Sequence, residues 1–487
     1  MKKIIVIGAG IAGLTAAIYA KRSGFDVTLI EQHNIVGGMC TSWKRKGYLF
    51  EGAIHWLTGS SPKTGIHRLW KDTGALGDDI RVILQDPFYS VEHEGKILNL
   101  YRSIDKTVEQ LLPISPNDNK KLLQLRKDVK KLSKMQMPVA DIKGVKSENP
   151  VKMSPGFIFS VIPLIGTMTR LGKMSCKDFA TRFEHPGIQK LFNFMTDDYD
   201  ALSFVFTLAT LDMGDGGYPE GGSLAMVERM SKTFTDLGGT LLLKSKVQKV
   251  IINDGIVTGI KLDDNEIKAD AVIITQETIA ALDNLFDTPP DDDWLQELRT
   301  TTKLAVCTFI SVGINAEIPE TPVWDLNEPI NHAGQNIYKL GFNNYTGYDG
   351  YAPSGCTTLT TAFMSDTYDF WKQAKENNRY KEEKDILAEQ IKKAICDKYP
   401  QAIGKIDVID IATPLTYERY TGAYRGSWMA IKEPGDKMKQ YPAYSDKIKG
   451  LYFAGHRMMT PGGLPVALLS GRNAAQLVCR QFDVVFK

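Results

Sequence analysis

Short apolar runs separated by glycine-rich turns give this chain its most regular pattern. The run Ile4–Ile7 is wholly apolar and β-branched, which predicts a central parallel strand buried on both faces. A helical pattern follows over Leu14–Ser23, and Val27–Ile30 predicts the next strand. This succession of strand, helix and strand is typical of an α/β nucleotide-binding unit.

Similar patterns predict further elements in the middle and at the end of the chain. Asn253-Asp254-Gly255 has the composition of a tight hairpin turn between two strands. Pro465 suits the first turn of a helix that runs to about Gln481, because proline lacks the N–H that this turn leaves unpaired. The other predicted elements are helices over Leu224–Leu237 and Lys381–Lys398 and strands over Thr240–Ile252, Ile256–Leu262, Glu266–Thr275, Leu304–Val312 and Thr357–Phe363.

The turn between the first strand and the first helix, Gly8-Ala9-Gly10-Ile11-Ala12-Gly13, has the spacing of a dinucleotide-binding loop. Gly8 permits the tight turn, Gly10 lets a pyrophosphate approach the backbone, and Gly13 lets the helix pack closely on the strand. The phosphates then face the N-terminus of the helix. The residues expected to bind the cofactor here are Gly8, Gly10, Ile11, Ala12, Gly13, Glu31 and Gln32.

The acid at the end of the second strand narrows the choice of dinucleotide. Glu31 can accept hydrogen bonds from both hydroxyls of an adenosine ribose, and its charge disfavours a 2′-phosphate. FAD or NAD is therefore favoured over NADP. A second glycine pair, Gly37-Gly38, followed by Met39, lets the backbone pass close to the longer FAD, as in flavoproteins of the glutathione-reductase-like, amine-oxidase type, which this stretch resembles.

A third glycine-rich segment lies near the end of the chain. Gly450–Gly455 reads as a strand and turn, and Thr460–Pro465 then opens the last helix. The N-terminus of this helix could face the pyrimidine edge of a flavin and stabilise the negative charge that builds on reduction. The alternative is an ordinary surface helix. The candidate cofactor residues here are Gly455, Gly462, Gly463, Leu464 and Pro465.

Composition excludes several classes of protein. The chain has 487 residues, 43% hydrophobic and 24% charged, which is an ordinary globular balance and, at roughly 150 residues a domain, suggests about three domains. A net charge of +2 makes nucleic acid an improbable partner. The six cysteines form no CxxC pair, so neither a metal site nor a flavin-linked disulfide is predicted. No second strand–GxGxxG–helix unit occurs, which leaves the substrate, oxygen, a quinone or another protein as the redox partner of the flavin.

These motifs together resemble the phytoene desaturase, carotenoid isomerase and retinol saturase group of FAD-dependent oxidoreductases. The similar stretches are Lys2–Gly59, Gly217–Ser223 with its YPxGG signature, and Thr413–Gly422. The resemblance implies an α/β fold, in which a two-dinucleotide-binding (glutathione-reductase-like) Rossmann FAD domain is joined to an α+β substrate domain with a helical, partly apolar insertion. We expect the FAD domain to be assembled from residues 1–78, 215–290 and 446–487, and the substrate domain from 79–214 and 291–445.

The same resemblance implies an activity. FAD would be the cofactor, and hydride transfer with flavin N5 would act on carbon–carbon bonds of an apolar polyene, by desaturation, saturation or isomerisation. Two alternatives stay open: an amine or porphyrinogen oxidase on the same fold, and a protein without net redox turnover, either an isomerase that needs reduced FAD or a lipid-binding flavoprotein. The oligomeric state is not predicted.

Several residues are candidates for roles near the flavin. The resemblance places His55 where the chain passes the flavin ring, as the candidate catalytic residue, and the backbone of Val247 against adenosine; a structural role for His55 is the alternative. His456-Arg457 could contact phosphate or flavin, or be structural. Asp197–Asp200 could hold a carboxyl with a raised pKa, or be a solvated helix end.

A basic and an apolar segment stand next to each other in the predicted insertion, residues 120–175. Residues 120–152 carry ten Lys or Arg against three Asp or Glu, and Phe157–Leu171 is apolar apart from Arg170. The apolar stretch is too short to span a bilayer, so it predicts either a monotopic membrane contact or a buried segment beside a solvated helix. Gly8, Gly10 and Gly13 argue against a cleaved N-terminal signal, because cleavage would remove them. We therefore expect a cytoplasmic protein, peripheral on a membrane if that contact forms.

Overall fold

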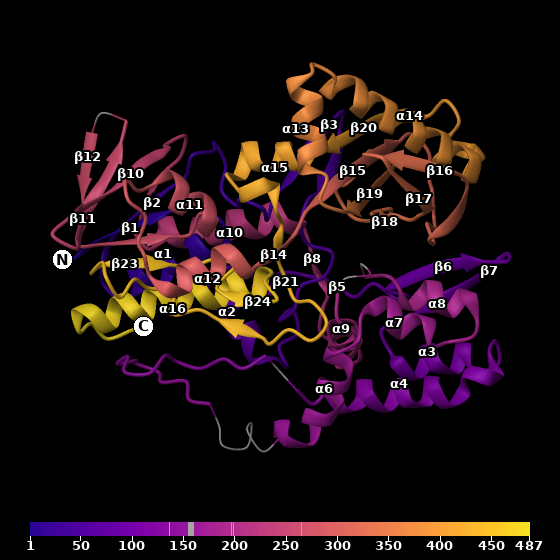
Figure 1. Cartoon of the computed structure of the whole chain (residues 1–487), viewed down its shortest axis with the longest axis horizontal. Helices are drawn as coiled ribbons and strands as arrows, with labels where there is room; N and C mark the ends of the chain where they lie inside the picture. The colour runs from indigo at the N-terminus through magenta and orange to yellow at the C-terminus, as the bar shows by residue number, and fades with distance from the viewer. Residues whose placement is uncertain (136, 154–159, 196, 198, 264) are drawn as a thin grey trace.

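The structure is a computed structural model, and it describes every residue except 136, 154–159, 196, 198 and 264. A five-stranded parallel sheet forms the centre of the left-hand half of the molecule (Figure 1). Its strand order is β23-β13-β1-β2-β9, so the chain leaves the sheet after β2 and returns to it three times, for β9, β13 and β23. The strands are β1 (Lys3–Ile7), β2 (Asp26–Ile30), β9 (Thr240–Leu242), β13 (Ala271–Ile274) and β23 (Leu451–Phe453).

The first helix lies between the sheet and two other helices. Helix α1 (Ile11–Arg22) packs on α16 (Leu464–Phe482) and on α10 (Gly222–Asp236). Ten of its twelve residues are buried, which explains why its apolar positions show so little helical periodicity. It begins three residues before the predicted start, because Ile11, Ala12 and Gly13 of the glycine-rich turn already form its first turn.

Two of the predicted strands are each divided between two sheets. The stretch Thr240–Ile252 forms β9 in the parallel sheet and then β10 (Val247–Asn253), and Glu266–Thr275 is divided between β12 (Asn265–Lys268) and β13. The prediction of continuous strands was wrong, because Lys244 takes a left-handed conformation (φ 54°) and Asp270 turns to accept a hydrogen bond from the backbone N–H of Lys3. Strands β10, β11 (Ile256–Leu262) and β12 form a separate antiparallel meander.

A second, mainly antiparallel sheet occupies the upper right of Figure 1. Its order is β18-β19-β15-β20, and helices α13 (Tyr368–Glu376) and α14 (Tyr380–Lys398) lie above it. The predicted strand Leu304–Val312 breaks at Val306 into β14 (Lys303–Ala305), which pairs with β21 (Met429–Ile431), and β15 (Cys307–Ile314). The other strands here are β16 (Trp324–His332), β17 (Gln335–Leu340), β18 (Asn343–Asn344), β19 (Thr357–Met364) and β20 (Ile406–Ala412).

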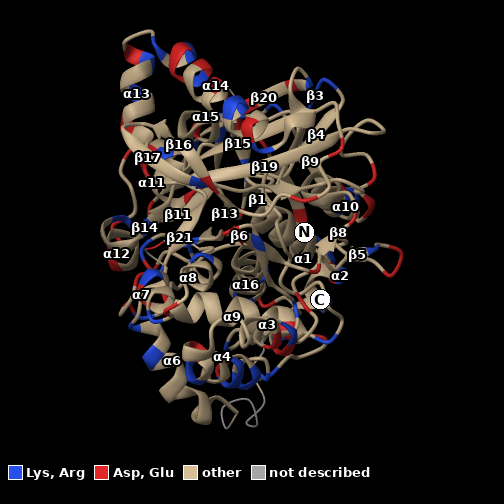
Figure 2. Cartoon of the chain, turned by 90° about the vertical axis from the view of Figure 1, so that its right-hand side faces the viewer, with Lys and Arg blue, Asp and Glu red and all other residues tan. Residues whose placement is uncertain are grey.

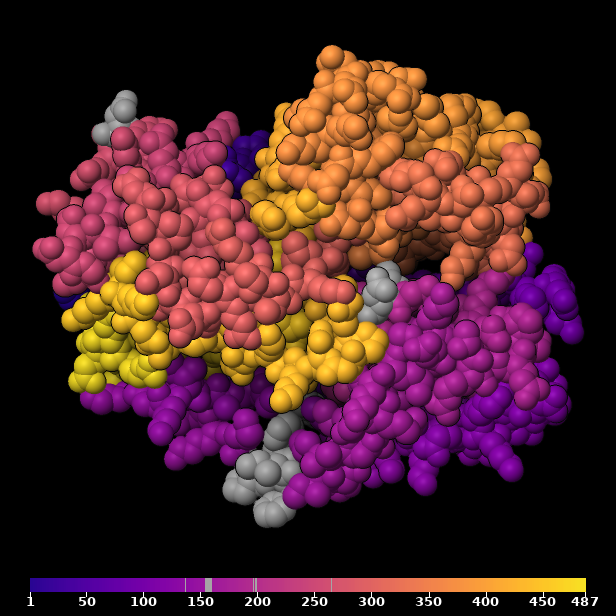
Figure 3. Space-filling view, viewed as in Figure 1, coloured from indigo at the N-terminus to yellow at the C-terminus, as the bar shows by residue number. Residues whose placement is uncertain are grey.

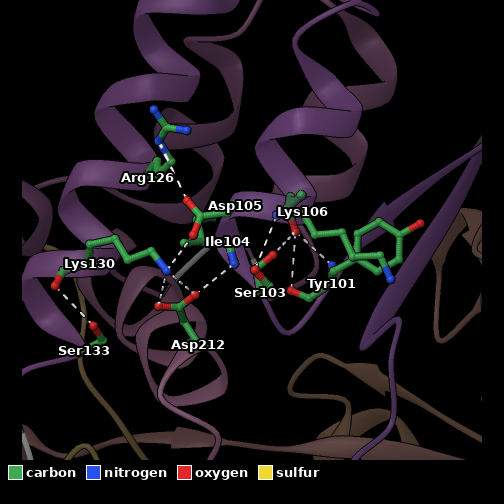
Figure 4. Close-up of polar contacts among 10 residues, drawn as sticks. Tyr101, Ser103, Ile104, Asp105, Lys106, Arg126, Lys130, Ser133 and Asp212 are labelled. Atoms are coloured by element: carbon green, nitrogen blue, oxygen red, sulfur yellow. Dashed lines mark hydrogen bonds and ion pairs between the residues drawn. The ribbon is translucent and has the colours of Figure 1, made fainter.

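A layer of helices fills the lower right, under the hairpin of β6 (Tyr89–His93) and β7 (Lys96–Leu100). Charged side chains hold three of these helices together, as Figure 4 shows: Lys130 on α4 pairs with Asp105 on α3 and with Asp212 at the end of α9, both at 2.9 Å. The Asp212 carboxylate also accepts from the backbone N–H of Ile104. The helices are α3 (Ile104–Leu111), α4 (Asn119–Leu132), α6 (Ile165–Gly172), α7 (Cys176–Thr181), α8 (Pro186–Phe192) and α9 (Ala201–Asp212).

Shorter elements connect these layers. They are β3 (Ser42–Arg45), β4 (Tyr48–Glu51), α2 (Gly65–Asp72), β5 (Val82–Ile83), β8 (Tyr218–Pro219), α11 (Thr278–Asn284), α12 (Asp293–Thr301), α15 (Pro414–Thr421), β22 (Lys439–Gln440), β24 (Met459–Thr460) and four 3-10 turns, η1 (Pro116–Asp118), η2 (Ile162–Leu164), η3 (Pro400–Ala402) and η4 (Tyr424–Gly426).

Buried apolar side chains form three large clusters. One surrounds the parallel sheet, one lies within the helical layer and one lies between the second sheet and α14. Trp294, Leu295 and Leu298 of α12 belong to the first cluster, although they follow residue 290. The boundaries expected for the two domains stay a prediction. Of the apolar stretch Phe157–Leu171, residues 157–159 lie outside the described residues.

Candidate cofactor and substrate site

One cavity of about 1330 Å³ extends from the carboxyl ends of the parallel strands into the helical layer. Its wall is built from segments far apart in the sequence: the turn after β1, the end of β2, the start of β10 and the loop before α16. Ligands of open parallel sheets bind at this edge, where neighbouring connections diverge. The cavity is therefore the candidate site for the dinucleotide and for its substrate.

The turn after β1 needs glycine for two separate reasons. Gly8 has φ 100°, a conformation that side chains rarely adopt. A Cβ on Gly13 would lie 1.8 Å from the carbonyl oxygen of Gly8, so only glycine lets the helix pack so closely on the turn. Gly10 faces the cavity instead, and the nearest atom to a Cβ there would be the Gly37 oxygen at 3.6 Å. The turn thus exposes backbone, rather than side chains, to the cavity.

Two helices begin at the cavity wall without a side-chain cap. Gly10 precedes α1 and Gly463 precedes α16, and among the described side chains none accepts a hydrogen bond as the cap of either helix. The first backbone N–H groups of a helix carry partial positive charge and bind anions well. Gly463 also has φ 118°, and Pro465 occupies the first turn of α16. Two separate anion-binding positions therefore face one cavity.

Glu31 and the glycine pair Gly37-Gly38 hold the glycine-rich turn after β1 in place. The backbone N–H of Gly37 donates to the carbonyl of Ala9 at 2.8 Å, which places Gly37 beside Gly10. The Glu31 carboxylate accepts from the backbone N–H groups of Ala9 (2.8 Å) and His33 (2.9 Å) and still lines the cavity. Each oxygen keeps a further lone pair, so the carboxylate can accept hydrogen bonds from the two hydroxyls of a ribose.

The structure brings almost all the predicted site residues onto this cavity. Gly13 is the exception, because it packs behind the turn against Gly8. Those that line the wall are Gly8, Gly10, Ile11, Ala12, Glu31, Gln32, Gly37, Gly38, Met39, His55, Val247, Gly455, Gly462, Gly463, Leu464 and Pro465.

A buried carboxylate that the sequence analysis missed holds the segment after β4 in place. Glu51 is fully buried and accepts hydrogen bonds from the backbone N–H groups of Ile54 and Ser223 and from the Tyr218 hydroxyl. A Cβ on Gly222 would lie 2.2 Å from its Oε2. The YPxGG signature therefore packs around Glu51. An acid directly before Gly52, in an otherwise apolar run, was the available signal.

His55 lies where that segment meets the cavity. Its Nδ1 accepts a hydrogen bond from Nδ2 of Asn343 at 3.1 Å, so the proton of the neutral ring is on Nε2. Burial lowers the pKa of His55, and the negative charge of Glu51 opposes this only in part. The neutral ring stands next to Trp56, with ring centroids 6.5 Å apart. His55 can thus offer one N–H to a ligand in the cavity.

The neighbouring residues His456 and Arg457 have different roles. His456 lines the cavity, and burial together with the adjacent charge of Arg457 lowers the pKa of the imidazole to about 3. Arg457 is 1% exposed, is not part of the cavity wall and pairs with Glu277, with 2.6 Å between Nε and Oε1. Its guanidinium also donates to the Ser427 hydroxyl. Arg457 therefore holds neighbouring segments together.

The segment 137–153 closes one side of the cavity by crossing α16. Asp141 lies 2.6 Å from Nη2 of Arg472 and accepts from Gln476, both on α16. The backbone N–H of Phe486 donates to the carbonyl oxygen of Lys146, and the backbone N–H of Glu148 donates to the carbonyl oxygen of Phe486. Met137, Ala140 and Ile142 consequently form part of the wall.

The part of the cavity next to the helical layer is largely apolar. Helix α9 contributes Leu202, Phe206 and Thr207 to the wall. Trp428 and Met429, from the C-terminal third of the chain, also line the cavity. Of the acidic cluster Asp197–Asp200, residue 198 lies outside the described residues. Asp200 is 1% exposed and caps α9 by accepting from the backbone N–H of Ser203 at 2.8 Å. The alternative of a solvated helix end was therefore wrong for Asp200, because the turn before α9 points into the molecule.

Among the described residues, no group of three or more His, Cys, Asp or Glu side chains could hold a metal ion. Within the same residues, no helix is long and apolar enough to cross a bilayer.

A glycine-lined turn, a buried acid after β2 and two uncapped helices that share one cavity are the features of a flavoprotein of the FAD-binding type. The chain belongs to the family of flavin-containing amine oxidoreductases, which it matches over residues 11–479. It is 23% identical to a 1-hydroxycarotenoid 3,4-desaturase of Flavobacterium sp. (strain P99-3), covering 98% of this chain and 99% of the relative. It is 22% identical to an all-trans-retinol 13,14-reductase of Danio rerio, covering 94% of this chain and 83% of the relative.

Solved structures confirm an α/β FAD-binding fold, while the predicted α+β substrate domain and its apolar insertion stay predictions. The cyclohexylamine oxidase of Brevibacterium oxydans IH-35A superposes with a TM-score of 0.59 at 15% identity, covering 99% of each chain. The predicted resemblance to the group of phytoene desaturases, carotenoid isomerases and retinol saturases is confirmed, as are FAD as the cofactor and the class of FAD-dependent oxidoreductase.

Proposed function

We propose that this protein oxidises or reduces carbon–carbon bonds of an apolar polyene. The observation that carries the proposal is the continuity of the cavity, which joins the uncapped helix N-termini to an apolar chamber beside α9. Bound FAD supplies hydride exchange at N5. A polyene needs few polar partners, and this chamber offers mainly apolar surface. The relatives with 1-hydroxycarotenoid and retinol in their names support the same substrate class.

Most of the polar contacts to FAD in this proposal come from four places along the chain. The backbone of Gly8–Gly10 and the first turn of α1 hold the pyrophosphate. Glu31 accepts from the ribose hydroxyls, and the backbone of Val247 contacts the adenosine. The first turn of α16 would face the pyrimidine edge of the flavin, where its partial positive charge would favour negative charge on the ring.

His55 is the proposed contact between protein and reacting centre. Since its ring is neutral and Nδ1 is already bonded to Asn343, Nε2–H can orient the substrate or the flavin but cannot accept a proton. The chain's own residues thus supply orientation and exclusion of water, and the redox change stays with the bound cofactor.

Anaerobic mixing of the oxidised protein with candidate substrates tests the proposal. A polyene should bleach the visible absorbance of the flavin and yield a product that differs by two hydrogens. If the protein acts as a saturase, the pre-reduced flavin should instead be reoxidised by the polyene. Bleaching by small amines, followed by release of hydrogen peroxide once oxygen is admitted, and no response to polyenes, would establish an amine oxidase instead.

Two further measurements separate the remaining alternatives. Product formation at an unchanged flavin redox state, and only with reduced FAD, would show an isomerase. Organic extraction of the purified protein followed by mass spectrometry should find an isoprenoid, whereas a polar amine would contradict the proposal.

We also propose that the tip of the helical layer touches a membrane. Ile162 and Ile165 are 55% and 54% exposed, and many positions along α4, at the lower end of the molecule, are Lys or Arg (blue in Figure 2). Part of the basic surplus is used inside the protein, since Arg170 pairs with Asp128 and Lys130 with Asp105. The apolar pair therefore carries more of this proposal than the charge does.

A further inference from the structure

The chamber beside α9 contains one pair of opposite charges in otherwise apolar surroundings. Nζ of Lys432 lies 2.9 Å from Oδ2 of Asp200, and the two side chains are 7% and 1% exposed. Both residues line the cavity. They come from distant parts of the chain, because Asp200 precedes α9 and Lys432 follows β21. In Figure 3 the yellow segment after β21 runs beside the purple helical layer, which brings the two together.

The cavity as a whole is rich in soft, apolar side chains. Nine of the chain's 16 methionines line it, and methionine adapts its shape to irregular ligands. Such a wall can accommodate a long chain but does not select one end of it. The methionines are Met39, Met135, Met137, Met153, Met168, Met195, Met429, Met438 and Met459.

A polar stripe on α9 continues from the charged pair. Asp200, Ser203 and Thr207 are spaced three and four residues apart, so they share one face of the helix, and all three line the cavity. The Thr207 hydroxyl donates to the carbonyl of Ser203 at 2.9 Å. The remainder of α9 is strongly apolar, and most of it is buried. The stripe therefore marks one end of the chamber as polar.

Stability alone does not explain a buried pair at this place. Desolvation of two charges offsets most of their attraction, and apolar side chains of similar volume would hold the fold equally well. Lys432 has three N–H donors, and among the described residues only Asp200 accepts from one of them. Asp200 uses one lone pair for Lys432 and one for the Ser203 N–H, which leaves others free. The pair thus presents unused donors and acceptors to the cavity.

The signs of the charges select the ligand group. A carboxylate would be attracted by Lys432 and repelled by Asp200, and an ammonium group would meet the opposite combination. A hydroxyl both accepts and donates, so it can take an N–H from Lys432 and give its own proton to Asp200. A hydrocarbon end would leave both groups without a partner, which is costly in an apolar chamber.

We propose that Lys432 and Asp200 form a subsite for an alcohol hydroxyl at the end of the substrate's apolar chain. This inference rests on the proposed function and deepens it, because it names the polar group that fixes which end of a polyene enters first. The subsite then determines which carbon–carbon bond of the chain stops beside the flavin.

The test compares three probes that differ in one end group: retinol, retinoic acid and the corresponding hydrocarbon without the hydroxyl. Binding is followed by the change in the visible spectrum of oxidised flavin under anaerobic conditions. The wild-type holoenzyme should bind retinol about tenfold more tightly than the hydrocarbon, a difference of about 1.4 kcal/mol, because only retinol can form hydrogen bonds with the charged pair. It should bind retinoic acid less tightly than retinol.

The informative variant is Lys432→Met combined with Asp200→Ser. Serine keeps the cap of α9, and methionine keeps the volume of the lysine, so no unpaired charge remains. Retinol should lose about tenfold in affinity and fall to the level of the hydrocarbon, whose affinity should change less than twofold. Lys190→Met is the matched control, because Lys190 is a largely buried lysine paired with Asp325 outside the cavity, and this variant should keep the preference for retinol.

Each other outcome overturns a distinct statement. If the double variant keeps the tenfold preference for retinol, Lys432 and Asp200 are not the hydroxyl subsite. If the wild type prefers retinoic acid, the subsite binds a carboxylate and the inference is wrong. If all three probes bind equally, only the hydroxyl subsite fails, whereas no spectral response to any of them contradicts the proposed function itself.

Discussion

Gly13 lies behind the nucleotide turn and never reaches the cavity, yet the turn depends on it. The glycine lets α1 approach so closely that the carbonyl of Gly8 occupies the space of a Cβ. Gly8 and Gly463 depend on glycine for another reason, since their positive φ angles are strained for other residues. Glycines that look equivalent in the sequence are therefore required for different physical reasons, and only the backbone geometry shows which reason applies to each.

Replacing Gly13 by alanine should disrupt the turn. The added Cβ would lie 1.8 Å from the Gly8 oxygen, so the helix must move, at a cost of about 1–3 kcal/mol or more. We expect a lower urea midpoint and less than a tenth of the wild-type FAD per protein after purification. Gly166→Ala is the control, because a Cβ there meets no atom within 4 Å, and it should retain FAD. Full FAD content in Gly13→Ala would contradict this account of the turn.

At the scale of elements, buried charges join segments that the hydrophobic pattern leaves separate. Glu277 caps α11 and accepts from the backbone N–H of Tyr424, while its partner Arg457 follows β23. Asp215 acts in a similar way, accepting from the backbone N–H groups of Gly59 and Ser61. Such contacts fix the position of loops whose own residues have little tendency to form regular structure.

Replacing only one residue of the Arg457–Glu277 pair should destabilise the fold more than replacing both. Glu277→Gln leaves a buried guanidinium without its counter-charge, and we expect a loss of about 3–5 kcal/mol in the free energy of unfolding. The double variant Glu277→Gln with Arg457→Met removes that charge and should regain most of the loss. Urea denaturation of the two single variants and the double variant measures the coupling. Additive losses would show that the pair has no coupling energy.

Over the whole molecule, the cavity is closed by parts of the chain that lie far apart in sequence. The segment 137–153 crosses α16, and the stretch after β21 meets the helical layer (Figure 1). The exposed Ile165 begins α6, and Met168 of the same helix lines the cavity. The proposed membrane contact would therefore bring a lipid-soluble substrate close to the chamber.

Substitution of the exposed isoleucines should weaken membrane contact. In Ile162→Ser with Ile165→Ser, we expect the fraction that sediments with anionic vesicles to fall at least threefold, because burial of each side chain contributes about 1.5–3 kcal/mol. Ile403→Ser is the control, since Ile403 is 64% exposed in a different layer. A wild-type protein that does not sediment even at low salt would rule the contact out.

The sequence by itself determined the parts of this protein that depend on neighbouring residues. The turn glycines, the apolar strand before them and the acid after β2 lie within thirty residues, and their spacing alone predicts a dinucleotide site. The strand divisions at Lys244 and Asp270 escaped prediction, because the hydrophobic pattern continues across both breaks while the backbone changes sheets.

Only the tertiary structure decided which distant side chains meet. Glu51 joins the YPxGG signature, Arg457, behind the cavity wall, pairs with Glu277, and Lys432 reaches Asp200 more than two hundred residues earlier. No local pattern encodes these contacts, since the pairing of buried charges depends on how whole layers pack and on which groups are left without water. The cofactor could therefore be predicted from the sequence, whereas the shape and polarity of the substrate chamber could not.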